Sequence, residues 1–230
     1  MRKKILLILP LLIFAITQQL QAVTCNWGYC NSVVNDQFGS VNKGKGAIHI
    51  PAEISKMYEG KQLSYVRVGL AAKAKTVKVF VTKDLNGEYI TTRTQRDQLS
   101  GFNEIKFAEP WTIDGEGFYI GYEFESDDYA LGSSTMYNEN GCWADLGDGW
   151  KNYAVEDHAL ALSIQAKISG DNLPKDYWLF CSNDILAEAG KPFNINFSIR
   201  NMGTAIGRRF QVAYSIDGGE EVTEEIKQTL

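Results

Sequence analysis

The sequence predicts an all-β protein, in which a jelly-roll-like β-sandwich is followed by an incomplete immunoglobulin-like β-sandwich. Apolar and polar residues alternate in many short segments from residue 47 onward, which is the pattern of strands with one buried face. Glycine-rich turns separate these segments, and no long segment has the helical period. The composition agrees, because the 230 residues include 21 Gly, 11 Tyr, 11 Phe and 5 Trp.

The first sandwich is predicted over residues 23–168. Its clearest strands have apolar faces formed by Val66, Val68 and Leu70, by Val77, Val79 and Val81, by Phe118, Ile120, Tyr122 and Phe124, and by Leu160, Leu162, Ile164, Ala166 and Ile168. Between them, Asn86 and Gly87 predict a type I′ hairpin turn, since both residues tolerate positive φ. Further strands are predicted over residues 88–96 and 103–107, the second ended by Pro110. Only residues 51–59 predict a helix.

The polar segment 169–176 interrupts the strand pattern and predicts a linker. After it, residues 177–230 resemble the N-terminal part of an immunoglobulin-like domain, with alternation at 195–199 and 210–216 and turns at 201–203 and 217–219. Such a domain takes about 100 residues. Either this unit is an incomplete sandwich, or the sequence is a fragment of a longer protein, and we favour the second interpretation.

Residues 1–22 have the layout of a secretory signal peptide: three basic residues, an apolar segment over residues 5–16, and Ala22 at the expected cleavage point. The apolar segment is shorter than the ~20 residues of a transmembrane helix, which disfavours a retained anchor. Acylation of Cys25 is a less favoured alternative, because Thr24 is a poor residue before a lipidated cysteine. We expect an exported protein of the periplasm, the outer-membrane surface or the extracellular space, with no transmembrane segment in the mature chain.

The charge of the mature chain disfavours nucleic acid as a partner. Removal of Arg2, Lys3 and Lys4 changes the formal net charge from −5 to −8. Binding to nucleic acid requires a basic surface that neutralises phosphates.

Four cysteines remain in the mature chain, and all are disulfide candidates: Cys25, Cys30, Cys142 and Cys181. Four cysteines allow three connectivities, of which a Cys25–Cys30 bridge would close a small loop. Their spacing matches neither C-x-x-C nor a zinc site. We favour structural bridges or buried thiols over a thiol enzyme that uses Cys25 and Cys30, or a dyad of Cys142 with His158.

No catalytic motif supports an enzymatic function. The sequence has no G-x-S-x-G, H-E-x-x-H, Walker A or G-x-G-x-x-G string, and its two histidines are His49 and His158. Asp145 and Asp148, in a glycine-containing segment, are candidates for a structural Ca²⁺ site. Two carboxylates leave most of the 6–8 oxygen ligands of Ca²⁺ unfilled, so we favour a turn-forming role and expect no cofactor.

Aromatic residues predicted to lie in loops are the best candidates for ligand binding. Trp111, Tyr137, Trp143 and Trp150 could stack on sugar rings, with Asn138, Asn140 or Asp145 hydrogen-bonding the hydroxyls. The alternative, which we favour, is that these rings fold back and fill the ends of the sandwich. The candidate partners are thus a glycan or a host or cell-surface protein.

Several short motifs carry a family resemblance: Gly44-Lys45-Gly46, Ile48-His49-Ile50-Pro51-Ala52-Glu53, Val66-Arg67-Val68-Gly69, Gly101-Phe102-Asn103-Glu104-Ile105, Phe118-Tyr119-Ile120-Gly121-Tyr122 and Gly149-Trp150. The chain resembles a β-sandwich module, commonly placed ahead of an immunoglobulin-like domain, in secreted and outer-membrane surface proteins of Bacteroides-type bacteria. The resemblance implies a non-catalytic binding, adhesion or scaffold module. Alternatively, the chain is the accessory N-terminal region of a secreted hydrolase or thioredoxin-like protein.

Overall fold

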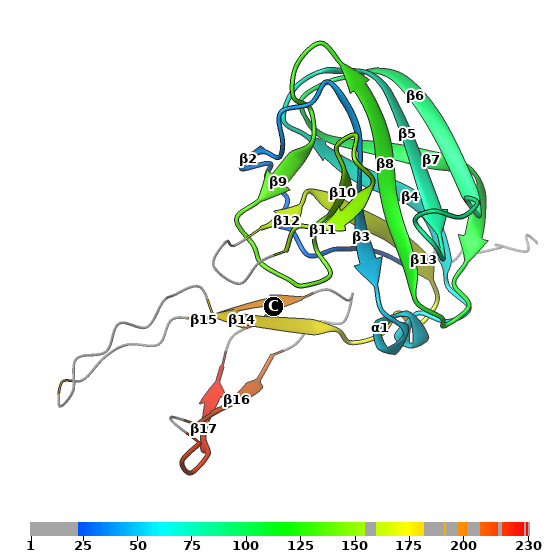
Figure 1. Cartoon of the computed structure of the whole chain (residues 1–230). Coiled ribbons are helices and arrows are strands. Elements are labelled where there is room, and N and C mark those ends of the chain that lie inside the picture. The colour runs from blue at the N-terminus through cyan, green and yellow to red at the C-terminus, as the bar shows by residue number, and fades with distance from the viewer. Residues whose placement is uncertain are drawn as a thin grey trace, which may run out of the picture.

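The computed structural model describes residues 23–154, 160–181, 191, 197–201, 208–215, 218–227 and 229 (Figure 1). The predicted signal peptide, residues 1–22, lies outside these residues, as does His158. Cys181 belongs to a strand, but its side chain is also outside the description.

Strands make up 56% of the structure and helix 3%, so the all-β sandwich prediction is confirmed. The elements of the sandwich are β1 (Val23–Trp27), β2 (Asp36–Gln37), β3 (Lys43–Ile50), α1 (Ala52–Met57), β4 (Gln62–Leu70), β5 (Ala74–Thr82), β6 (Thr91–Gln98), β7 (Gly101–Thr112), β8 (Phe118–Ser126), β9 (Gly132–Ser134), β10 (Trp143–Asp145), β11 (Trp150–Asn152), β12 (Ala161–Leu162) and β13 (Ile164–Gly170). Four strands follow: β14 (Tyr177–Cys181), β15 (Phe197–Asn201), β16 (Phe210–Tyr214) and β17 (Val222–Ile226).

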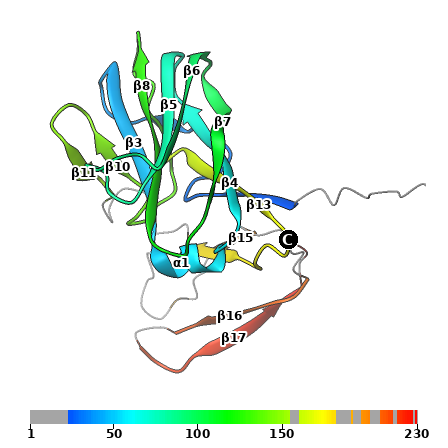
Figure 2. The same ribbon diagram turned by 90° about the vertical axis from the view of Figure 1, so that its right-hand side faces the viewer.

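Two antiparallel sheets pack face to face in the sandwich (Figure 2). One has the strand order β1-β13-β4-β7, and the other has the order β11-β10-β3-β8-β5-β6. Along the chain, β1, β4, β7 and β13 belong to the first sheet and β3, β5, β6 and β8 to the second. This interleaving of two Greek keys is a jelly roll. The short strands β10 and β11 extend the second sheet beyond β3, and β12-β9-β2 form a small third sheet.

The core lies between the sheets and is formed by the alternating apolar residues that predicted the strands. In β8, Phe118, Ile120, Tyr122 and Phe124 are buried, as are Val77, Val79 and Val81 in β5. The hydroxyl of the fully buried Tyr122 donates to the Gly69 carbonyl at 3.3 Å and accepts the Gly132 N–H at 3.3 Å. These bonds satisfy a polar group that would otherwise be costly to bury.

The predicted type I′ turn at Asn86 and Gly87 is wrong, since neither residue has positive φ. Asp84 shapes this connection instead: its side chain accepts the Asn86 N–H at 2.9 Å, and its carbonyl accepts the Gly87 N–H at 3.0 Å. The hydroxyl of Thr82 donates to the carbonyls of Asp84 and Glu88. An aspartate turn therefore replaces the glycine-dependent one.

β7 is longer than predicted, because it continues through Pro110 to Thr112. The register with β4 shifts between Leu63 and Tyr65, and the paired residues resume with Leu63 opposite Trp111. Proline is tolerated at such irregularities, where no ladder hydrogen bond from its nitrogen is needed.

The predicted linker 169–176 lies partly against the sandwich. β13 continues to Gly170, and Leu173 is buried in the core. Beyond it, β14 pairs with β15 and β16 pairs with β17, both antiparallel. β15 and α1 lie at the same end of the sandwich (Figure 2). Arg200 of β15 donates to the Cys30 carbonyl, so the second unit contacts the first through its side chains.

Candidate functional site

Trp143 and Trp150 lie in strands, not in the predicted loops. Trp143 begins β10 and Trp150 begins β11, and both are half-buried. Each strand has three residues. That length is too short to produce a recognisable alternation, which explains why the sequence suggested a loop. Both side chains lie on the outer surface of the six-stranded sheet, because Ala144 between Trp143 and Asp145 is buried in the core.

A group of aromatic side chains covers this outer surface, and we call it the outer aromatic face: Phe80, Tyr89, Tyr119, Trp143 and Trp150. Strand register brings its members together, since Phe80 pairs with Gly121, Gly121 with Ala47, and Ala47 with Trp143. Phe80 is buried, whereas the other four rings are partly exposed.

The rings of the outer aromatic face contact one another in two clusters. Phe80 stacks on Tyr89 with the ring centroids 4.4 Å apart and meets Trp150 edge-on at 6.2 Å. Tyr119 meets Trp143 edge-on at 5.6 Å. On its other side, Tyr119 stacks on His49 at 4.6 Å. These contacts hold the rings in defined positions at the surface.

Charged groups border the rings. The Tyr89 hydroxyl donates to Glu123 at 2.6 Å, and Lys78 lies 3.7 Å from the same carboxylate. Burial and the Glu123 carboxylate raise the pKa of Tyr89 above its ordinary range. Lys45 lies 3.9 Å from the Asp145 carboxylate and 5.9 Å from the centroid of the Trp150 ring. The face therefore combines ring surfaces with hydrogen-bonding groups of both signs.

The two carboxylates of the candidate Ca²⁺ site have structural partners. Asp145 Oδ1 accepts the N–H groups of Gly147 and Gly149, each at 3.0 Å. Asp148 forms an ion pair with Lys151. In the described residues, no group of three His, Cys, Asp or Glu side chains is placed to hold a metal ion. Asp145 thus has the turn-forming role that its glycine-rich context predicts.

The other two predicted aromatic residues lie apart from the outer aromatic face. Trp111 belongs to β7 in the opposite sheet, where it meets Phe118 edge-on at 4.8 Å. Lys83 covers it, with Nζ 5.4 Å from the ring centroid. Tyr137 is exposed in the segment between β9 and β10.

Asn138 and Asn140, also predicted as site residues, line a cavity of about 310 Å³ at the end of the sandwich. Asn138 Oδ1 accepts the Asn140 N–H at 2.9 Å, and Asn140 Oδ1 lies 3.0 Å from His49 Nδ1. Because His49 stacks on Tyr119, this bond connects the cavity with the outer aromatic face. The aromatic residues that line the cavity were not predicted as site residues: Trp27, Tyr29, Tyr177 and Trp178.

Three of the disulfide candidates, Cys25, Cys30 and Cys142, are free and buried thiols in the structure. Burial, with a contribution from the Asp176 carboxylate, raises the pKa of Cys25 to about 11. Burial also raises the pKa of Cys30 to about 11 and that of Cys142 to about 12. The thiolate is the reactive form, so these environments disfavour nucleophilic chemistry.

We expect iodoacetamide at pH 8 to leave Cys25, Cys30 and Cys142 unmodified in the folded chain and to alkylate all three in urea. Folded-state pKa values of about 11 for Cys25 and Cys30 and about 12 for Cys142 keep each thiol protonated at that pH, and burial also blocks access. Peptide mass spectrometry measures the modification at each cysteine. Rapid alkylation of folded Cys30, or a Cys25–Cys30 bridge in the unfolded sample, would contradict this expectation.

These features define a jelly-roll β-sandwich with an aromatic outer face on its larger sheet and an aromatic cavity at one end. Comparisons with protein-family models, curated proteins and solved structures find no match to this chain. The resemblance to Bacteroides-type surface proteins therefore stays a prediction. In the part of the chain that the structure describes, no helix has the length and apolar character needed to cross a membrane.

Proposed function

We propose that this chain is a non-catalytic glycan-binding module of an exported protein. The outer aromatic face carries the proposal, because it places the partly exposed rings of Tyr119, Trp143 and Trp150 side by side on a sheet surface. Pyranose rings have an apolar C–H face that packs on such rings and hydroxyls that hydrogen-bond with polar groups around them.

The polar border of the face supports the same ligand class. Glu123 and Asp145 supply acceptors, and Lys45 and Lys78 supply donors, all on the same side of the sheet as the rings. Since strand pairing already holds these side chains, binding orders little of the protein and loses little affinity to that ordering. The lack of a catalytic motif and the signal-peptide-like N-terminus agree with a surface or secreted binding role, either alone or as an accessory module.

Trp150→Ala is expected to weaken glycan binding about tenfold, because truncation of a central aromatic contact costs more than 1 kcal/mol in a binding interface. A panel of immobilised polysaccharides and oligosaccharides first identifies a ligand for the full chain. Isothermal titration calorimetry then measures the affinity of the wild type and the variant for that ligand.

Tyr65→Ala is the matched control. Tyr65 is a half-buried aromatic residue on the outer surface of the opposite sheet, with Lys167 5.0 Å from its ring centroid. Its removal should leave glycan affinity unchanged. Equal losses for both variants, or no binding to any glycan in the panel, would overturn the proposal, and selective binding to a host protein would favour an adhesion function instead.

A further inference from the structure

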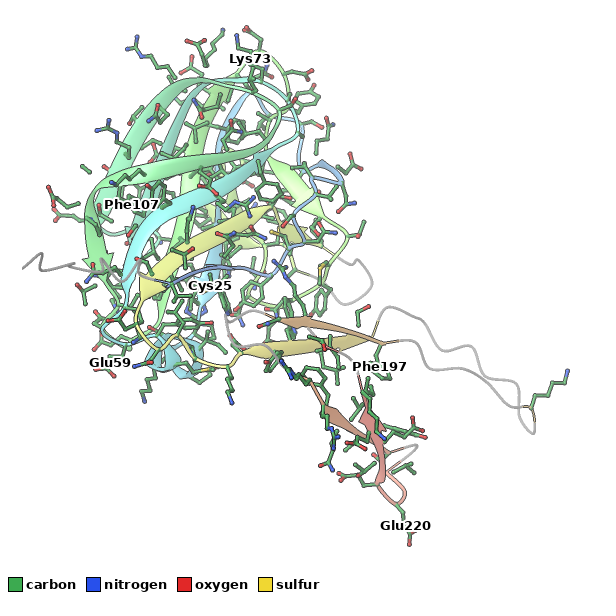
Figure 3. All side chains as sticks on the ribbon, turned by 180° about the vertical axis from the view of Figure 1, so that it is seen from behind. Cys25, Glu59, Lys73, Phe107, Phe197 and Glu220 are labelled. Atoms are coloured by element: carbon green, nitrogen blue, oxygen red, sulfur yellow. The ribbon has the colours of Figure 1, made fainter. Side chains whose placement is uncertain are left out.

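The cavity at the end of the sandwich has walls of aromatic rings. Trp27 is the last residue of β1 and Tyr29 follows it, whereas Trp178 comes from β14, more than a hundred residues later in the sequence. The Trp27 and Tyr29 rings are 5.0 Å apart with an interplanar angle of 73°, and Tyr29 and Trp178 are 5.5 Å apart at 77°. Figure 3 shows β14 and β15 beneath the sandwich, on the side where Cys25 of β1 lies. Nearly perpendicular rings thus enclose part of the space.

The cavity is also lined by three carboxylates: Glu53 of α1, Glu139 between β9 and β10, and Asp176 before β14. Among the described lining residues there is no lysine, arginine or histidine. None of the three acids forms an ion pair with another described residue. The cavity therefore has a negative electrostatic potential, which no ion pair with a described residue neutralises.

The Asp176 carboxylate and the turn that carries Glu139 are held in place by the surrounding structure. Asp176 Oδ2 accepts hydrogen bonds from Trp27 Nε1 at 3.0 Å and from the Tyr58 hydroxyl at 2.9 Å. The turn that carries Glu139 is closed by the Asn138–Asn140 hydrogen bond and by the Gly141 N–H, which donates to the Asn138 carbonyl at 2.8 Å. The site is consequently preformed, which favours binding of a small ligand.

The negative charge of the carboxylates acts on the phenol of Tyr29 in the cavity. Burial raises the pKa of the Tyr29 phenol above its ordinary range, and the negative charges of Glu53 and Glu139 raise it further. Both effects disfavour another negative charge in the cavity, and the charges of Glu53 and Glu139 favour a positive one.

We propose that this cavity binds an organic ammonium group. Aromatic faces attract ammonium groups through cation–π interactions, and the three carboxylates supply the compensating charge. The volume of about 310 Å³ lies at the small end of ligand pockets, so it suits a head group or side chain more than an extended chain. A hard metal ion fits less well, because it needs several converging oxygen ligands, which the described residues do not group together. This site is separate from the outer aromatic face, and the inference does not depend on glycan binding.

Three small molecules test the proposal with the full chain: choline, its neutral isostere 3,3-dimethyl-1-butanol, and the smaller primary ammonium compound ethanolamine. Titration calorimetry measures binding, together with the change in tryptophan fluorescence, to which Trp27 and Trp178 contribute. We expect at least one of the two cations to bind at least tenfold more tightly than the neutral isostere. Preference for choline would indicate a quaternary ammonium ligand, and preference for ethanolamine a primary one. Equal binding of the cations and the isostere, or no binding of either cation, would overturn the proposal.

Glu53→Gln combined with Glu139→Gln removes two charges and keeps the shape of the side chains. This double variant should bind the preferred cation about tenfold more weakly, whereas Glu125→Gln, at an exposed position of β8, should leave the affinity unchanged. Both acids in the double variant are exposed at the cavity rim, so we expect the fold to be preserved. Unchanged affinity in the double variant would contradict the electrostatic basis of the site.

Discussion

Asp176→Ala is expected to lower the free energy of unfolding by about 3 kcal/mol, because it removes the acceptor of two charge-assisted hydrogen bonds. Trp27 Nε1 and the Tyr58 hydroxyl both donate to Asp176 Oδ2, at 3.0 and 2.9 Å. Tyr58 is 1% exposed, so its hydroxyl would lose the carboxylate that accepts from it in a site with little access to water. Hydrogen bonds to charged groups contribute roughly 1.5–3 kcal/mol each, and the half-buried position of Asp176 places them at the low end of that range.

Urea denaturation followed by tryptophan fluorescence measures this loss, and two variants define its cause. Asp176→Asn retains an acceptor oxygen and should recover part of the stability, whereas Asp171→Ala, in the same segment but exposed, should change it by less than about 0.5 kcal/mol. Equal stabilities of Asp176→Ala and wild type would show that this segment is a free linker, as the sequence predicted.

The strands of the jelly roll were predictable because each packs one face against the core and has its other face on the outside of the sandwich. The alternation at Phe118, Ile120, Tyr122 and Phe124 marks β8, and the same pattern in β4 and β5 identifies the centres of both sheets. Their ends were less predictable, because partner strands determine them. β7 passes Pro110 through a register shift with β4, which no local pattern indicates.

The candidate site was predictable only in part. The sequence indicates Trp143, Trp150 and Asn140 as ring and amide side chains suited to a ligand, and the structure places them on or beside one surface. Trp111 was selected by the same criterion, but it belongs to the opposite sheet. Sequence spacing cannot tell which of these aromatic residues share a surface, because the order of strands in a sheet determines which side chains are neighbours.

The cavity was not predictable from the sequence for the same reason. Trp27 and Asp176 are 149 residues apart, and their hydrogen bond depends on how β14 meets the end of the sandwich. The polar composition of residues 169–176 suggested a linker, although Leu173 is buried and Asp176 accepts two hydrogen bonds. β14 completes the cavity through Trp178, so ammonium binding requires contact between the first sandwich and the second unit.

Gly121→Ala is expected to destabilise the sandwich by about 3 kcal/mol and to disrupt the outer aromatic face at the same time. Gly121 lies in the middle of β8, between Ala47 of β3 and Phe80 of β5. A Cβ atom at this position would lie 2.3 Å from the Gly46 carbonyl oxygen and 2.7 Å from Phe80 Cζ. The first contact is with the backbone, so β3 would have to move away from β8. The second would displace the ring that supports Tyr89 and Trp150.

Thr94→Val provides the control for this prediction, since it adds apolar volume on the same side of the sheet, at an exposed position of the edge strand β6. It should change the free energy of unfolding by less than about 0.5 kcal/mol and leave glycan affinity unchanged. For Gly121→Ala, urea denaturation should show the stability loss, and calorimetry below the unfolding transition should show weaker glycan binding by the folded fraction. A variant that loses stability but binds its glycan with wild-type affinity would separate the two effects. In that case the position of Phe80 matters for the fold alone, and the partly exposed rings of Tyr119, Trp143 and Trp150 bind the glycan without depending on it.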